Sequence, residues 1–179
     1  MTSLALPRTD RPARRPAADL KPRIRIALAT GALAILALIG VALTRALLFG
    51  APGAAALREV ALAVHLAAVI PALPLGAWVL LARKGSPRHR LLGKIWLALM
   101  VTGAVSALWV RHLNDGRLSA IHLLVPVVLA GAWRVVASAR RGDIVAHKRA
   151  LIGLLAGGMI TPALLSFVPG RLMWTWLVG

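Results

Sequence analysis

Long apolar runs alternate along the chain with short connections rich in basic or small polar residues. The apolar runs cover about 24–49, 60–81, 91–110, 118–138 and 150–168. A helix of about 20 apolar residues is long enough to cross the roughly 30 Å hydrocarbon layer of a bilayer. The pattern therefore predicts an all-α integral membrane protein with five transmembrane helices, which form a single transmembrane domain over residues 23–179.

One segment of this pattern occurs twice. Residues 82–93 read ARKGSPRHRLLG, and residues 139–153 read ARRGDIVAHKRALIG. Each copy is a basic turn in which a histidine, His89 or His147, is followed by a cation, and each copy leads into an apolar run. The two histidines are 58 positions apart. A fixed period of this kind indicates a repeated structural unit.

A second pair of histidines keeps nearly the same spacing. His65 precedes the first basic turn, and His122 precedes the second, 57 positions later. We therefore predict two parallel helix-pair repeats, repeat A at about 58–110 and repeat B at about 117–168. Because both repeats cross the membrane in the same sense, an axis along the membrane normal should relate them. Spans two to five would then form a four-helix bundle, with the first span outside it.

The positions of the cations predict the orientation. Sixteen Lys and Arg residues lie in the N-terminal segment and the two basic turns, and five lie on the opposite side. The positive-inside rule then places the N-terminus in the cytoplasm and the C-terminus outside, across the cytoplasmic (inner) membrane. Residues 1–22 are rich in Arg, Pro and Ala and have no hydrophobic periodicity, so they are predicted to be a disordered basic cytoplasmic arm.

Composition and charge exclude several function classes. The chain is 59% hydrophobic and 15% charged, unlike an average soluble domain. Its formal net charge is +17, but the cations flank apolar spans, which indicates contact with anionic lipid at the cytoplasmic face rather than nucleic-acid binding. All five acidic residues lie in tails or connections, so no buried carboxylate relay of a proton-driven transporter is expected. The chain has no Cys and no HExxH motif or glycine-rich phosphate loop.

The repeat brings the four histidines into two pairs. Residues related by the axis can face each other across it, so we expect His65 and His122 to form an outer pair, and His89 and His147 to form an inner pair at the cytoplasmic end. Two opposed imidazoles on facing helices are the ligands that six-coordinate heme iron requires, and bundle cores commonly hold cofactors in this way. The four histidines are therefore candidate ligands of heme iron.

Each of these residues also has a simpler interpretation. The outer pair could make interhelical hydrogen bonds, and the inner pair could cap helices or contact a lipid phosphate. The glycines on the same helix faces could leave room for a macrocycle or could serve plain helix packing; they are Gly76, Gly157 and Gly158.

Other polar residues near the predicted span ends are less specific. His112 has no counterpart in the repeat and is expected to be solvated. Arg134 could reach a heme propionate but could equally extend toward the membrane surface. Four further arginines are candidate propionate partners on the outer side: Arg58, Arg111, Arg117 and Arg171.

Together these residues resemble a known family. The combination of His65, ARKGSPRHRLLG, Ser119-Ala-Ile-His122, RRGDIVAHKR and Pro169-Gly170-Arg171 resembles the bacterial predicted-membrane-protein family called domain of unknown function 2306, over about residues 59–171. That family has no established activity to transfer. The placement of four histidines on four consecutive helices also looks like the ascorbate-reducible diheme cytochrome b family. This likeness implies two heme b groups, one held by the outer pair and one by the inner pair.

Two functions remain open from the sequence. One is transmembrane electron transfer by a bis-histidine diheme cytochrome b-like protein, as a component of a membrane oxidoreductase. Its electron donor would be a quinol, a small reductant or a redox protein. The alternative is a non-catalytic membrane scaffold or partner subunit, whose histidines and basic turns are structural or bind lipid.

Overall fold

The protein is an all-helical bundle in the part of the chain that the structure describes. The structure is a computed structural model, and it describes residues 22–50, 59–82, 84–111 and 117–178. Most of the predicted N-terminal arm, Arg58 and His112 lie outside these residues. Five helical segments are long and apolar enough to span a membrane, which confirms the predicted fold class; they are Pro22–Phe49, Val60–Leu81, Pro87–Ala107, Ala120–Arg140 and Ile144–Leu165.

Some spans consist of more than one element. The first three spans are single helices: α1 (Pro22–Phe49), α2 (Val60–Leu81) and α3 (Pro87–Ala107). The fourth span is a 3₁₀ turn, η3 (Ala120–Leu123), followed by α4 (Leu124–Arg140). The fifth span is α5 (Ile144–Leu155), the π-helical segment η4 (Ala156–Ile160) and α6 (Thr161–Leu165), and the short helix α7 (Leu172–Val178) ends the described chain.

The third and fifth spans begin earlier than the apolar pattern predicts, because both basic turns contain a helix-capping residue. Ser86 accepts a hydrogen bond from the backbone N–H of His89 at 3.1 Å, and Pro87 follows at the first helical position. Asp143 accepts from the backbone N–H of Ala146 at 2.9 Å. Such caps satisfy backbone donors that have no partner within the helix. His89 and His147 therefore lie in the first turns of α3 and α5 rather than in loops.

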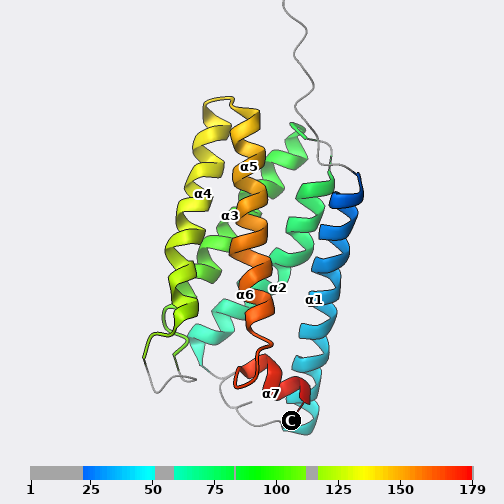
Figure 1. The fold of residues 1–179 in the computed structure, drawn as a ribbon, viewed down its shortest axis with the longest axis vertical. Coiled ribbons are helices and arrows are strands. Elements are labelled where there is room, and N and C mark those ends of the chain that lie inside the picture. The colour runs from blue at the N-terminus through cyan, green and yellow to red at the C-terminus, as the bar shows by residue number, and fades with distance from the viewer. Residues whose placement is uncertain (1–21, 51–58, 83, 112–116, 179) are drawn as a thin grey trace, which may run out of the picture.

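The helices pack in the order that the repeat predicts. The α2–α3 and α4–α5 hairpins are each closely packed, α3 contacts α4, and α1 lies against α2 and α7 (Figure 1). The core between them is formed by large apolar side chains, among them Leu73, Trp96, Met100 and Val135. Ile35 and Ile39 of α1 also reach this core.

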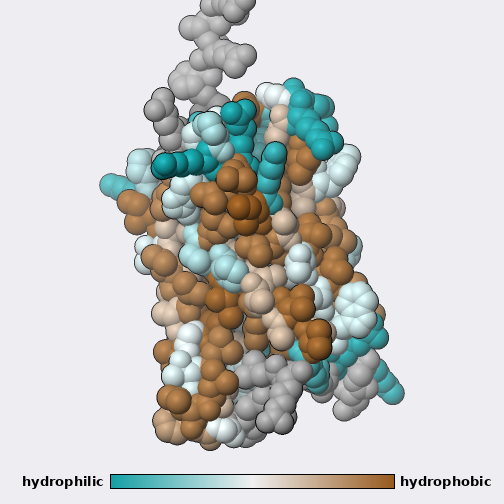
Figure 2. Space-filling view, turned by 180° about the vertical axis from the view of Figure 1, so that it is seen from behind, coloured by the Kyte–Doolittle hydropathy of each residue, from teal (hydrophilic) through white to brown (hydrophobic). Residues whose placement is uncertain are grey.

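Charge separates the two ends of the bundle. The α2–α3 and α4–α5 connections lie at the same end, here called the basic end, and α7 lies at the opposite end (Figure 1). Hydrophilic residues gather at the basic end, with a smaller group at the opposite end, while apolar residues cover most of the flank (Figure 2). This is the surface expected of a bundle surrounded by lipid. That the basic end faces the cytoplasm stays a prediction.

Gly76 and Trp96 are in close contact in the core of the bundle. Trp96 of α3 is only 1% exposed. A Cβ atom added at Gly76 of α2 would lie 2.6 Å from the Trp96 indole nitrogen and 3.2 Å from both Leu155 and Met159. The missing side chain of Gly76 thus serves close helix packing, and this space is filled by protein.

We predict that Gly76→Ala destabilises the protein by about 1–3 kcal/mol, because the rigid buried indole cannot move aside. Gly93→Ala on α3 is the matched control, since an added Cβ there meets nothing within 4 Å. Thermal unfolding in detergent should show a lower melting temperature for Gly76→Ala than for Gly93→Ala. Equal melting temperatures would show that the contact is not tight.

Candidate functional site: an apolar cavity with two histidines

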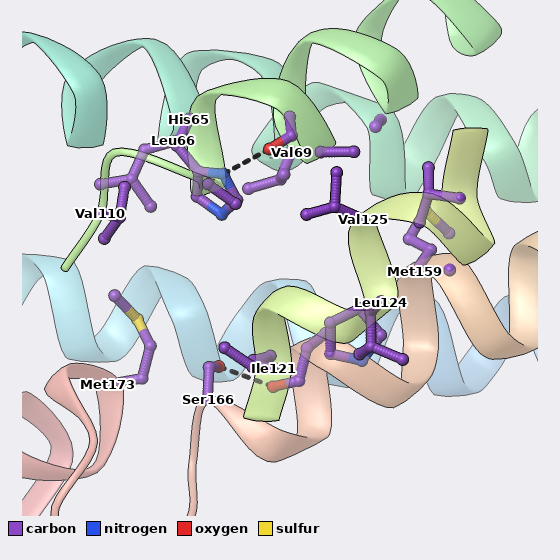
Figure 3. Close-up of a pocket in the computed structure, with 18 of the residues that line it drawn as sticks. His65, Leu66, Val69, Val110, Ile121, Leu124, Val125, Met159, Ser166 and Met173 are labelled. Atoms are coloured by element: carbon purple, nitrogen blue, oxygen red, sulfur yellow. Dashed lines mark hydrogen bonds between the residues drawn. The ribbon is translucent and has the colours of Figure 1, made fainter. Parts of the chain in front are cut away.

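A cavity of about 230 Å³ lies inside the bundle in the half near α7. Its wall includes residues of all five spans and of α7, and most of them are apolar, such as Leu66, Val69 and Val125 (Figure 3). The polar side chains in its wall are few: His65, Arg111, Ser119, His122, Ser166 and Arg171. Apolar walls with a few placed polar groups are typical of a small-molecule or cofactor site.

His65 enters this cavity from α2 and is held by α3. Its ring nitrogen Nδ1 lies 2.8 Å from the carbonyl oxygen of Gly103. Because a carbonyl only accepts, Nδ1 carries the proton and donates it, which leaves Nε2 with a free lone pair. The imidazole projects from α2 into the space between the helices (Figure 3).

The α2–α3 contact that permits this bond is unusually close. A Cβ atom at Gly103 would lie 2.8 Å from the Val69 side chain, so only glycine allows α3 to approach α2 at this point. One turn further, Ser106 donates to the same carbonyl at 3.1 Å, and its hydroxyl lies 3.4 Å from the His65 Nδ1. Gly103 and Ser106 thus fix the orientation of the His65 ring.

His122 enters the cavity from the other repeat. It is 8% exposed and lies in η3, where it forms a capping box with Ser119. Its Nδ1 lies 2.9 Å from the backbone nitrogen of Ser119 and 3.0 Å from the Ser119 carbonyl oxygen. The ring can therefore accept from the Ser119 N–H or donate to the Ser119 carbonyl without moving. The first state presents Nε2 to the cavity as a donor, and the second presents it as a lone pair.

The structure thus brings the predicted outer pair into one cavity, each ring held through Nδ1. The hydrogen bonds that the His65 and His122 rings make to described residues all involve Nδ1 and not Nε2. The two Nε2 atoms are therefore available to a ligand in the cavity. Two imidazoles whose Nε2 positions face a cavity could ligate a metal, or could donate to and accept from a polar ligand.

Two of the four predicted outer arginines reach the same cavity. Arg111 and Arg171 line it near the end of the bundle, and the Arg111 Nε donates to the carbonyl of Leu108. Arg117 is not part of the wall, and Arg58 lies outside the described residues. Two guanidinium groups at one end of an apolar cavity favour a ligand that is apolar at one end and anionic at the other.

The inner pair lies apart from this cavity, at the basic end. The Nδ1 of His147 on α5 lies 3.0 Å from the carbonyl oxygen of Val135 on α4. His89 on α3 is close enough to interact electrostatically with His147 and Lys84. The Nδ1 of His89 is buried and has no partner within the described residues. Arg134 is exposed on α4.

Several residues of the site escaped the sequence analysis. Gly103 and Ser106 were not singled out, although both position His65. All the methionines after Met1 line the cavity: Met100, Met159 and Met173. Methionine side chains are flexible and adapt to irregular ligands, so this wall can change shape.

The π-helical segment η4 also belongs to the site. Pro162 has no backbone N–H, and the residue before it, Thr161, donates to the Ala156 carbonyl through both its backbone N–H and its hydroxyl, the latter at 2.9 Å. The resulting segment brings Gly158 and Met159 into the cavity wall. Such π-helical turns occur often at functional sites, and the sequence signal for this one is proline immediately after threonine within an apolar run.

We predict that the cavity end is open to water. Because the chain has no native cysteine, Ala107→Cys in the cavity wall and Ala98→Cys on the lipid-exposed side of α3 form a clean pair. A thiol reacts as its thiolate, which does not form in hydrocarbon. An anionic methanethiosulfonate should therefore label Ala107→Cys much faster than Ala98→Cys in membranes. Equal rates would contradict an open cavity.

Comparison with known proteins gives one family. Its profile, described as "Predicted membrane protein (DUF2306)", matches residues 62–170. Curated proteins give no match, and solved structures give none either. The matched region contains both histidine pairs and most of the cavity wall. Because the match covers more than half of the chain, this protein belongs to the DUF2306 family of predicted membrane proteins.

Proposed function

We propose that the protein is a membrane electron-transfer protein that binds one heme b between His65 and His122. A single observation carries this proposal. Two imidazoles, one from each helix-pair repeat, enter the same apolar cavity, and each ring is held through Nδ1 and not Nε2. This is the donor set of a six-coordinate b-type cytochrome.

The hydrogen bonds of both rings suit this role. Metal-bound histidines nearly always donate their second ring nitrogen to a carbonyl or carboxylate, which fixes the ring and raises its basicity. His65 makes this bond to Gly103 at 2.8 Å, and His122 can make it to Ser119 at 3.0 Å. Ligation by His122 would favour the tautomer that donates to the Ser119 carbonyl.

The size of the cavity suits a heme less well than its histidines do. The cavity volume of about 230 Å³ is just below the roughly 300–1,000 Å³ of common ligand pockets, so a macrocycle requires movement of wall side chains. The flexible Met100, Met159 and Met173 supply this freedom. Arg111 and Arg171 would contact the propionates at the cavity end.

A bound heme would supply one-electron redox chemistry, and the chain would control it. His65 and His122 would both hold the iron, so the chain would leave no site for oxygen, and the apolar wall would provide a surrounding of low polarity. The electron donor would be one of the classes expected from the sequence, a quinol, a small reductant or a redox protein, and would approach at the end that carries Arg111 and Arg171.

The proposal is for one heme, at the outer pair. Trp96, Leu155 and Met159 fill the space beside Gly76, one of the glycines that could have left room for a macrocycle. A second heme at His89 and His147 stays a prediction of the sequence pattern. The alternative function, a scaffold with structural histidines, also accounts for the Nδ1 bonds, so the two are distinguished by heme content.

The test is expression with ample heme, followed by heme and metal analysis of the purified protein. We expect one heme per chain and a low-spin absorption spectrum. His65→Ala should lose this spectrum, and added imidazole should restore it by filling the vacated position, which an unfolded variant could not do. His147→Ala is the control and should keep its heme.

Three outcomes would overturn the proposal. They are a colourless wild-type protein, an unchanged spectrum in His65→Ala, and copper or another metal without porphyrin. Circular dichroism of each variant verifies that the helices are retained.

A further inference from the structure

We propose that the basic end carries a binding site for the phosphate of an anionic phospholipid, formed by the inner pair and the basic residues beside it. The inner pair is defined by His89 on α3 and His147 on α5. This proposal is independent of heme binding at the outer pair, because the two sites lie in opposite halves of the bundle.

The two repeats place their basic turns next to each other. His147 of α5 and Lys84 lie near enough to His89 of α3 to repel its protonated ring, although α3 packs mainly on α2 and α5 mainly on α4. Both helices start here, at Pro87 and Ile144. Their first backbone N–H groups add partial positive charge to that of the side chains.

A buried polar atom at this place has no partner. The Nδ1 of His89 is shielded from solvent and makes no hydrogen bond within the described residues, whereas the Nδ1 of His147 bonds to Val135. Buried polar atoms are nearly always satisfied in proteins, and an exception indicates a missing water, ion or ligand. The His89 side chain as a whole is only partly buried, so a turn of the ring toward the surface would let this nitrogen donate to a phosphate oxygen.

The charges around the inner pair are almost all of one sign. The described acidic side chain at this end is Asp143, and it caps α5 through the N–H of Ala146. The described cations are numerous: Arg23, Lys84, Arg88, Arg90, Lys94, Arg140, Arg141, Lys148 and Arg149. Within the described residues, positive charge at this surface far exceeds negative charge, which favours an anion bound from outside.

The neighbouring surface identifies the anion as a lipid headgroup. Large apolar side chains are exposed within a few residues of the cations: Leu81 (43%), Leu91 (59%), Ile144 (50%) and Val145 (51%). Apolar and basic surface meet at this end of the bundle (Figure 2). A phospholipid satisfies both, with its phosphate on the basic residues and its acyl chains along the flank, whereas a free phosphate satisfies only the first.

The test measures lipid binding to the full chain in detergent by native mass spectrometry and by thermal shift. The probes are phosphatidylglycerol, phosphatidylcholine and soluble glycerol phosphate. Phosphatidylglycerol should bind and raise the melting temperature, and the other two should not. The double variant Lys84→Gln/His89→Gln should bind phosphatidylglycerol about tenfold more weakly than the wild-type protein. The single variant His89→Gln should show part of this loss.

The matched control removes a cation at the opposite end. Arg45→Gln lies in α1 near α7 and should leave phosphatidylglycerol binding unchanged. The proposal is overturned if Arg45→Gln has the same effect, because the attraction would then be general. It is also overturned if glycerol phosphate binds as tightly as phosphatidylglycerol. The same holds if the wild-type protein contains a second heme that His89→Gln removes.

Discussion

The site depends on the hydrogen bond between the imidazole of His65 and the carbonyl of Gly103. Inside a membrane a polar ring must find its partners within the protein, because lipid offers none. The bond requires α2 and α3 to touch, and glycine at position 103 permits this contact, since a Cβ there would clash with Val69. The same bond fixes the tautomer of His65 and so determines what its Nε2 offers to the cavity.

The two ends of the bundle differ in what surrounds their histidines. In the half near α7, His65 and His122 face a cavity whose wall contains flexible methionines and two arginines. Toward the basic end, Trp96 fills the core beside Gly76. One symmetric pattern in the sequence thus gives two unequal surroundings, an apolar cavity within the bundle and a basic surface at its end.

Much of this fold could be predicted from the sequence, because apolar length and equal spacing are properties of residue order. The five spans and the shared cavity of His65 and His122 followed from them. The packing of Trp96 against Gly76 could not be predicted, because it depends on which residues meet across helices. The early starts of α3 and α5 were missed because Ser86 and Asp143 extend helices into segments that are polar overall.

The central claim is that His65 and His122 would together hold the iron of one heme. The low-temperature electron paramagnetic resonance spectrum of the oxidised, heme-loaded protein tests it most directly. Two imidazole ligands make ferric iron low-spin, so the account predicts the low-spin signal of a single bis-imidazole heme. A high-spin ferric signal in the wild-type protein would mean that one axial position is open, and it would contradict the account.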